Sequence, residues 1–150
     1  MKQLFTTAVF LLAGLLATAQ SGTKVKWNYS AKKLAANKYE VRLTATIDKG
    51  WHLYSQQQSE DAIALPTTIS FAKNPLVTLV DKTKEVGKLY DQYDKATASR
   101  SRFYSDKVEF VQVVTTRGTV KTTVSGEVEF MVCDDKQCLP PDKVKFSVAL

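Results

Sequence analysis

Apolar and polar residues alternate along most of the chain, and this period of two is the pattern of a half-buried β-strand. The clearest example spans residues 39–47, in which every second residue is apolar. Turn residues separate this run from shorter runs with the same alternation. The strands predicted in this way lie at residues 24–29, 39–47, 51–54, 67–72, 76–80, 86–90, 107–115, 120–132 and 143–150.

Many short strands with turn signals at close intervals are typical of a β-sandwich. After the first twenty residues, no segment of the sequence shows helical periodicity. We therefore predict an all-β fold, an immunoglobulin-like antiparallel β-sandwich with apolar side chains directed inward and polar side chains outward.

Polar segments between the predicted strands are expected to be loops, among them residues 31–37, 56–61 and 90–106. The last of these is long and rich in small residues, yet it contains Tyr90, Tyr93, Phe103 and Tyr104. A loop with exposed aromatic rings can form a contact surface. Alternatively, the rings pin the loop onto the sandwich, and we prefer this second interpretation.

The N-terminus carries the pattern of a secretory signal peptide over residues 1–19. Lys2 precedes an apolar run at residues 4–16, and the small residues Ala17 and Ala19 follow it in the spacing of a cleavage site. A membrane-spanning helix needs about 20 apolar residues, and this run is shorter. We expect an exported protein whose mature domain, residues 20–150, does not insert into a membrane.

Charge and composition argue against several classes of function. The formal net charge is +6, but the lysines and arginines occur singly or in pairs, whereas nucleic-acid binding would require a clustered basic stripe. Two cysteines and the single His52 are too few for a zinc site, so we expect no metal and no cofactor. We interpret His52 as a strand residue near a sheet edge rather than as a catalytic base.

The two cysteines, Cys133 and Cys138, lie between two alternating apolar runs that predict a β-hairpin. Directly opposed residues in such a hairpin have Cβ atoms about 4.5–5.5 Å apart, close to the separation in a disulfide. The two cysteines can therefore pair with each other. Disulfides persist in oxidising compartments, which agrees with export.

The residues themselves leave open whether this pair is structural or reactive. As a staple it closes a short loop and stabilises the fold by only about 2 kcal/mol. As a reactive pair it needs an accessible sulfur, and the strand pattern places Cys133 on the face opposite Phe130 and Val132, outside the expected core. Asp134 and Asp135 bring negative charge beside the sulfur and disfavour the thiolate.

Three blocks of sequence, residues 47–54, 90–93 and 126–141, occur in the order found in a known family. With them the chain resembles the N-terminal (alpha) periplasmic domain of the thiol:disulfide interchange protein DsbD. The resemblance implies an immunoglobulin-like sandwich in which Cys133 and Cys138 shuttle between disulfide and dithiol. It also implies a periplasmic location, and it favours Cys138 as the sulfur that forms the mixed disulfide.

The resemblance further implies a cap over the cysteines, formed by Asp91, Gln92 and Tyr93 with Tyr93 as the covering ring. Trp51 and Tyr54 are expected to lie near this site. The expected partners are thioredoxin-fold proteins and a separate membrane electron-transfer protein. The alternative function is that of a secreted immunoglobulin-like binding module, with a purely structural hairpin disulfide and residues 90–104 as its contact surface.

Overall fold

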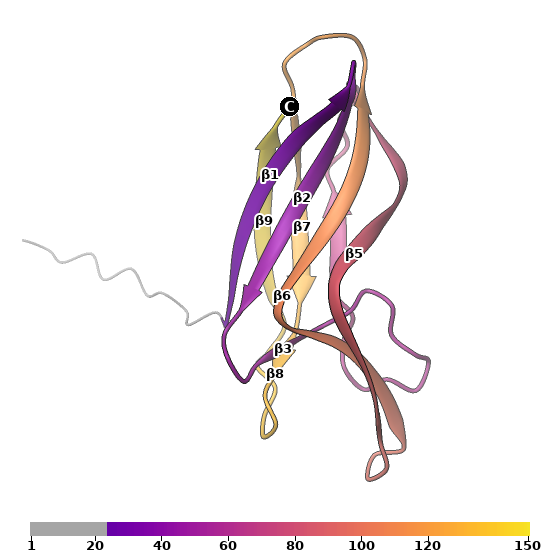
Figure 1. Cartoon of the computed structure of the whole chain (residues 1–150), viewed down its shortest axis with the longest axis vertical. Coiled ribbons are helices and arrows are strands. Elements are labelled where there is room, and N and C mark those ends of the chain that lie inside the picture. Colours follow the sequence, from indigo (N-terminus) through magenta and orange to yellow (C-terminus); the bar gives the residue numbers. More distant parts are fainter. Residues whose placement is uncertain (1–23) are drawn as a thin grey trace, which may run out of the picture.

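The computed structural model describes residues 24–150, and it consists of two β-sheets packed face to face (Figure 1). The predicted signal peptide lies outside the described residues. The prediction of an all-β antiparallel sandwich is confirmed. The strands are β1 (Val25–Ala35), β2 (Lys38–Ile47), β3 (His52–Tyr54), β4 (Thr68–Phe71), β5 (Val77–Asp94), β6 (Ser99–Thr116), β7 (Thr123–Phe130), β8 (Val132–Cys133) and β9 (Asp142–Ala149).

The larger sheet has the strand order β1-β2-β6-β3-β8, with β5 also paired to β6, and the smaller sheet has the order β4-β7-β9. Alternating apolar residues from both sheets fill the space between them, as the period-two pattern requires. The fully buried residues of this core include Val41, Leu43, Val108, Phe110 and Val128.

Strand β6 is the central strand of the larger sheet, and on one edge it changes partner half-way along its length. Its C-terminal half pairs with β2 from Lys107 to Thr115, and its N-terminal half pairs with β3 from Phe103 to Ser105. A turn at Gly50, with φ +83°, separates β2 from β3. Strand β3 therefore continues the sheet toward one end of the sandwich, where the β7–β9 connection also lies (Figure 1).

The prediction of loops at residues 31–37 and 90–106 is wrong, because most of both segments is β-strand. Residues 31–35 continue β1, and the chain turns only at Asn37, with φ 57°. Residues 90–106 form a β-hairpin, in which the distal half of β5 pairs with β6 as far as Asp94 and Ser99. Both faces of this ribbon carry polar side chains because much of it extends beyond the sandwich (Figure 1). The apolar alternation is therefore weak there, although the backbone pairing is continuous apart from two register shifts.

The β7–β9 hairpin is confirmed, with pairs from Thr123–Ala149 to Phe130–Asp142. Directly after β7 the chain passes from the smaller to the larger sheet. Met131 separates β7 from the two-residue strand β8, which pairs with β3 through Leu53–Val132 and His52–Cys133. The connection that carries both cysteines is thus attached to the larger sheet through β8.

Gly126 provides a test of this packing. It pairs with Phe146 in β9, and a Cβ atom at this position would lie 2.7 Å from Cζ of that ring and would also collide with the Ser70 carbonyl oxygen. We expect Gly126→Ala to lower the free energy of unfolding by about 1–3 kcal/mol, as overpacking does. Urea denaturation measures this change. The control is Ser147→Ala, an exposed position in β9 that should change stability by no more than about 0.5 kcal/mol. Equal stability of the two variants would contradict the packing described here.

Candidate redox site

Cys133 and Cys138 form a disulfide across a small turn at the end of the sandwich. The two residues are direct antiparallel partners, with their Cα atoms 4.0 Å apart. Two backbone hydrogen bonds flank the disulfide. The Asp134 N–H donates to the Gln137 carbonyl at 2.9 Å, and the Leu139 N–H donates to the Val132 carbonyl at 2.9 Å.

The turn is also held by a side chain. Oδ1 of Asp134 accepts hydrogen bonds from the backbone N–H groups of Lys136, at 2.8 Å, and Gln137, at 2.7 Å. These bonds favour the charged carboxylate and lower the pKa of Asp134. Asp134 therefore shapes the loop independently of the disulfide, and the loop has a reason to keep its conformation when the two sulfurs are reduced.

The two sulfurs differ in their exposure. Cys138 is exposed, whereas Cys133 is only 2% exposed. The prediction that Cys133 lies outside the core is wrong. It does occupy the face opposite Val132, but a second apolar cluster covers that face. The members of this cluster besides Cys133 are Tyr54, Ala64, Phe103 and Met131.

A row of aromatic rings extends from the buried cysteine across β3, β6 and β5. Phe103 lies 4.6 Å from the His52 ring, and Tyr90 stacks on the other side of Phe103 at 5.4 Å. His52 also meets Tyr54 edge-to-face at 5.5 Å. Burial raises the pKa of Tyr54. Sequence reasoning did not place His52 or Phe103 at this site, although the period of two puts His52 on the same face as the predicted site residue Tyr54.

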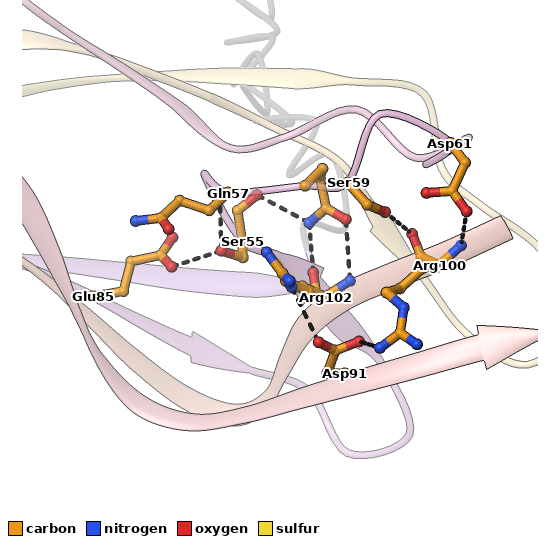
Figure 2. A network of polar contacts seen from close by, with 9 residues as sticks. Ser55, Gln57, Ser59, Asp61, Glu85, Asp91, Arg100 and Arg102 are labelled. Carbon is orange, nitrogen blue, oxygen red and sulfur yellow. Dashed lines mark hydrogen bonds and ion pairs between the residues drawn. The ribbon is translucent and has the colours of Figure 1, made fainter.

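A loop after β3 completes the cover over Cys133, and its side chains attach it to the edge of β6 (Figure 2). The Gln58 side chain donates from Nε2 to the Arg102 carbonyl at 2.6 Å and accepts the Arg102 N–H at 3.0 Å, so one amide takes the place of a neighbouring strand. Ser59 donates to the Arg100 carbonyl at 2.8 Å, and the Arg100 N–H donates to Asp61 at 3.1 Å. The same loop brings Ala64 into the cluster.

A carboxylate joins this loop to the base of the β5–β6 hairpin. Glu85 accepts hydrogen bonds from the Ser55 hydroxyl at 2.6 Å, the Gln56 N–H at 2.6 Å and the Tyr104 hydroxyl at 3.0 Å. Burial and the adjacent Glu85 charge raise the pKa of Tyr104 well above its usual range. Tyr104 therefore remains a protonated donor, and the base of the hairpin is fixed.

The three predicted cap residues lie in β5, near the tip of the hairpin, and not in a loop. Asp91 accepts hydrogen bonds from Arg100, at 2.8 Å, and Arg102, at 3.2 Å, and these bonds lower its pKa (Figure 2). Gln92 and Tyr93 line a cleft of about 390 Å³, whose other walls include His52, Tyr54 and Phe103. Tyr93 is 53% exposed.

The remaining predicted residues are divided between two places. Tyr54 belongs to the cluster around Cys133, whereas Trp51 packs against the main core and lies under the Lys24 ammonium, 5.4 Å from the ring centroid. Asp135 lies on the exposed part of the turn, beside Asp134. The structure thus brings together Cys133, Cys138, Tyr54 and the two aspartates, with Trp51 outside the cluster.

Within residues 24–150, no helix is long and apolar enough to cross a membrane. No curated protein sequence matches the chain. Among solved structures, the fold is similar to the N-terminal domain of DsbD from Neisseria meningitidis in the reduced form, with a TM-score of 0.52 and 13% identity over 84% of this chain and 85% of that chain. It is also similar to the N-terminal periplasmic domain of ScsB from Proteus mirabilis, with a TM-score of 0.51 and 12% identity over 84% of this chain and 44% of that chain.

These structural similarities confirm the immunoglobulin-like sandwich. At the level of sequence, the family described as "Thiol:disulfide interchange protein DsbD, N-terminal" matches residues 17–150, nearly the whole chain. Together with the disulfide between Cys133 and Cys138, this match shows that the chain belongs to the family of DsbD N-terminal domains.

Proposed function

We propose that Cys133 and Cys138 are the exchange centre of this thiol:disulfide interchange domain, and that Cys138 is the sulfur that partners attack. The unequal exposure of the two sulfurs carries the proposal, because an incoming thiolate must reach the sulfur along the axis of the disulfide bond. Family membership favours exchange with other redox proteins and does not favour the alternative, a binding module with a permanent disulfide.

The reaction proceeds in two steps. A partner thiolate attacks Sγ of Cys138, a mixed disulfide forms, and the bond to Cys133 breaks with the electron pair on the Cys133 sulfur. The second thiol of the partner then attacks the mixed disulfide. This releases Cys138 and leaves a dithiol here and a disulfide in the partner. The reverse sequence transfers the two electrons from the dithiol to the disulfide of an acceptor, so one site can both receive and donate electrons.

We further propose that the partners are thioredoxin-fold proteins of the periplasm, supplied with electrons by a separate membrane electron-transfer protein. The periplasm is an oxidising compartment in which this disulfide can form. The ScsB domain with the similar fold is described as periplasmic. The exposed Cys138 lies on a turn that projects from the end of the sandwich (Figure 1), where the active-site surface of a partner can reach it.

The tip of the β5–β6 hairpin is the proposed cap. It projects from the same end of the sandwich as the disulfide turn (Figure 1). Asp91 of β5 pairs with Arg100 and Arg102 of β6 and so joins the two strands of the hairpin. Tyr93 is half exposed and has room to move over the adjacent cleft. In the proposed mechanism, Tyr93 closes toward the sulfurs in the free protein and is displaced when a partner docks.

The assignment of the attacked sulfur predicts which single mutant traps a partner. We expect Cys133→Ser to accumulate a mixed disulfide through Cys138 with oxidised glutathione, because no second sulfur remains to release it. Cys138→Ser should react at least about tenfold more slowly, because the thiol of Cys133 is covered. Mass spectrometry of the adducts over time measures both rates, and the double serine variant is the blank. Equal rates would show that burial does not select the attacked sulfur.

An exchange disulfide should also be easier to reduce than a structural one. We expect the Cys133–Cys138 pair to have a reduction potential above about −300 mV, the limit typical of structural disulfides in secreted proteins. Equilibration in dithiothreitol or glutathione buffers, followed by alkylation and mass analysis, measures it. A potential well below that limit would favour a permanent staple.

The proposed cap predicts a kinetic effect of Tyr93. If the open form makes up about 10% of the population, removing the ring raises the rate of reaction with a small reagent about tenfold. The measurement is alkylation of the reduced protein by iodoacetamide, for Tyr93→Ala against wild type, with an unfolding curve to show unchanged stability. Lys95→Ala, which also lies at the cleft, is the matched control. Equal alkylation rates in all three proteins would remove Tyr93 from the cap.

A further inference from the structure

We propose that His52 is the proton acceptor and donor for Cys133 in thiol:disulfide exchange. This inference rests on the proposed function of the cysteine pair and adds a residue to it. It assigns a chemical task to the single histidine of the chain, which the sequence pattern marks only as a strand residue.

The pairing of two short strands places His52 at the reactive pair. In the register of β3 and β8, His52 is the direct antiparallel partner of Cys133. Such partners project from the same face of a sheet, with Cβ atoms about 4.5–5.5 Å apart. Phe103, which packs in the cluster of Cys133, also lies 4.6 Å from the imidazole ring. The ring is therefore held beside the buried sulfur by the backbone register and by an aromatic neighbour.

Burial of Cys133 creates a need for a local base. In the resolving step, the thiol of Cys133 must lose its proton before its sulfur can attack, and at 2% exposure it has little access to solvent bases. In the opposite direction, the same sulfur leaves with an electron pair and needs a proton. An imidazole is suited to both tasks because its ordinary pKa lies near neutral pH.

The other titratable groups around His52 are poorly suited to this task. On its own strand, the hydroxyl oxygen of Tyr54 lies 3.4 Å from Nε2, and burial raises the pKa of that phenol. On the turn after β8, Asp134 is occupied by two backbone N–H groups, and Asp135 is exposed.

Across the cleft, the β5–β6 hairpin contributes Tyr93, Asp94 and Lys95. A carboxylate is too weak a base for a thiol, and an ordinary lysine is already protonated at neutral pH. Among the described residues that face the site, the imidazole is thus the group whose ordinary pKa matches the transfer.

The surroundings of His52 favour a neutral imidazole in the free protein and stabilise the imidazolium that forms during proton transfer. Burial lowers the pKa of His52, so the free ring is neutral at neutral pH and can accept a proton. Asp135 and Asp134 act in the opposite direction and raise this pKa, so they stabilise the imidazolium once it forms. The thiolate of Cys133 would add to this stabilisation.

Proton transfer to His52 and sulfur exchange together oxidise the cysteine pair. With Cys138 in a mixed disulfide, the proton of the Cys133 thiol moves to a ring nitrogen of His52. The Cys133 sulfur attacks Sγ of Cys138, the intramolecular disulfide forms, and the bond between Cys138 and the foreign sulfur breaks. The foreign sulfur leaves as a thiolate and takes up the proton from the imidazolium or from solvent. Over both steps, Cys133 and Cys138 lose two electrons. The two sulfurs of the foreign disulfide gain them, one when the mixed disulfide forms and the other when it is resolved.

Reduced protein mixed with dithiobis(nitrobenzoate) tests the proposal, because each sulfur releases one coloured thiolate. The first release reports attack by Cys138 on the reagent, and the second reports attack by Cys133 on the mixed disulfide. In His52→Phe, which keeps an aromatic ring against Phe103, we expect the first rate to stay within about twofold. We expect the second rate to fall at least about tenfold at neutral pH, in the range of general acid–base effects.

The pH dependence separates proton transfer from packing. In wild type, the second rate should level off above the pKa of His52. In His52→Phe it should keep rising about tenfold per pH unit toward the ordinary thiol pKa of about 8.5. The control is Ser101→Ala, which removes another polar side chain at the same cleft, keeps the imidazole and should retain the wild-type profile.

An unchanged second rate and profile in His52→Phe would overturn the proposal, as would equal slowing of both releases or an equal effect of Ser101→Ala. Absence of the second release from wild type would instead contradict the proposed exchange function.

Discussion

The pairing of β3 with β6 on one side and β8 on the other is the constraint on which the site depends. Strand β3 has only three residues, yet it sets the position of Cys133 in the larger sheet. Its central residue, Leu53, faces the main core, so His52 and Tyr54 must face the other way, toward the cysteine and Phe103. One backbone register thus brings a sulfur, an imidazole and two aromatic rings together.

The second requirement is a cover for Cys133, and polar contacts supply it. The apolar cluster around the sulfur is small, and the loop that contributes Ala64 is attached through Gln58, Ser59 and Asp61 to backbone groups of β6. Each of these bonds satisfies a backbone N–H or C=O group on the edge of β6 that would otherwise need a further strand as its partner. The cover is therefore a side-chain extension of the sheet, and it leaves Cys138 accessible. In the proposed exchange reaction, this unequal access to the two cysteines sets the order of attack.

The β5–β6 hairpin is attached to the sandwich at its base and exposed at its tip. Glu85 and Tyr104 fix its base to the loop after β3, whereas Tyr93 near the tip is half exposed. Such a division suits the proposed cap, because few buried contacts would be lost if the tip opened for a partner. The Asp91 ion pairs are exposed and join the two strands of the hairpin to each other, so they stiffen the ribbon itself.

The sequence by itself determined the sandwich, the β7–β9 hairpin and the pairing of the cysteines, because apolar alternation and close spacing along the chain are local signals. The family resemblance added the exchange chemistry. Only the tertiary structure decided that Cys133 is buried and that residues 90–106 are a hairpin. The cover comes from residues 55–67 and from Phe103, which are distant in sequence, and the hairpin is held by backbone pairing with weak apolar alternation. The position of His52 opposite Cys133 could not be predicted from the sequence either, because a cross-strand register depends on how two segments distant in sequence pair.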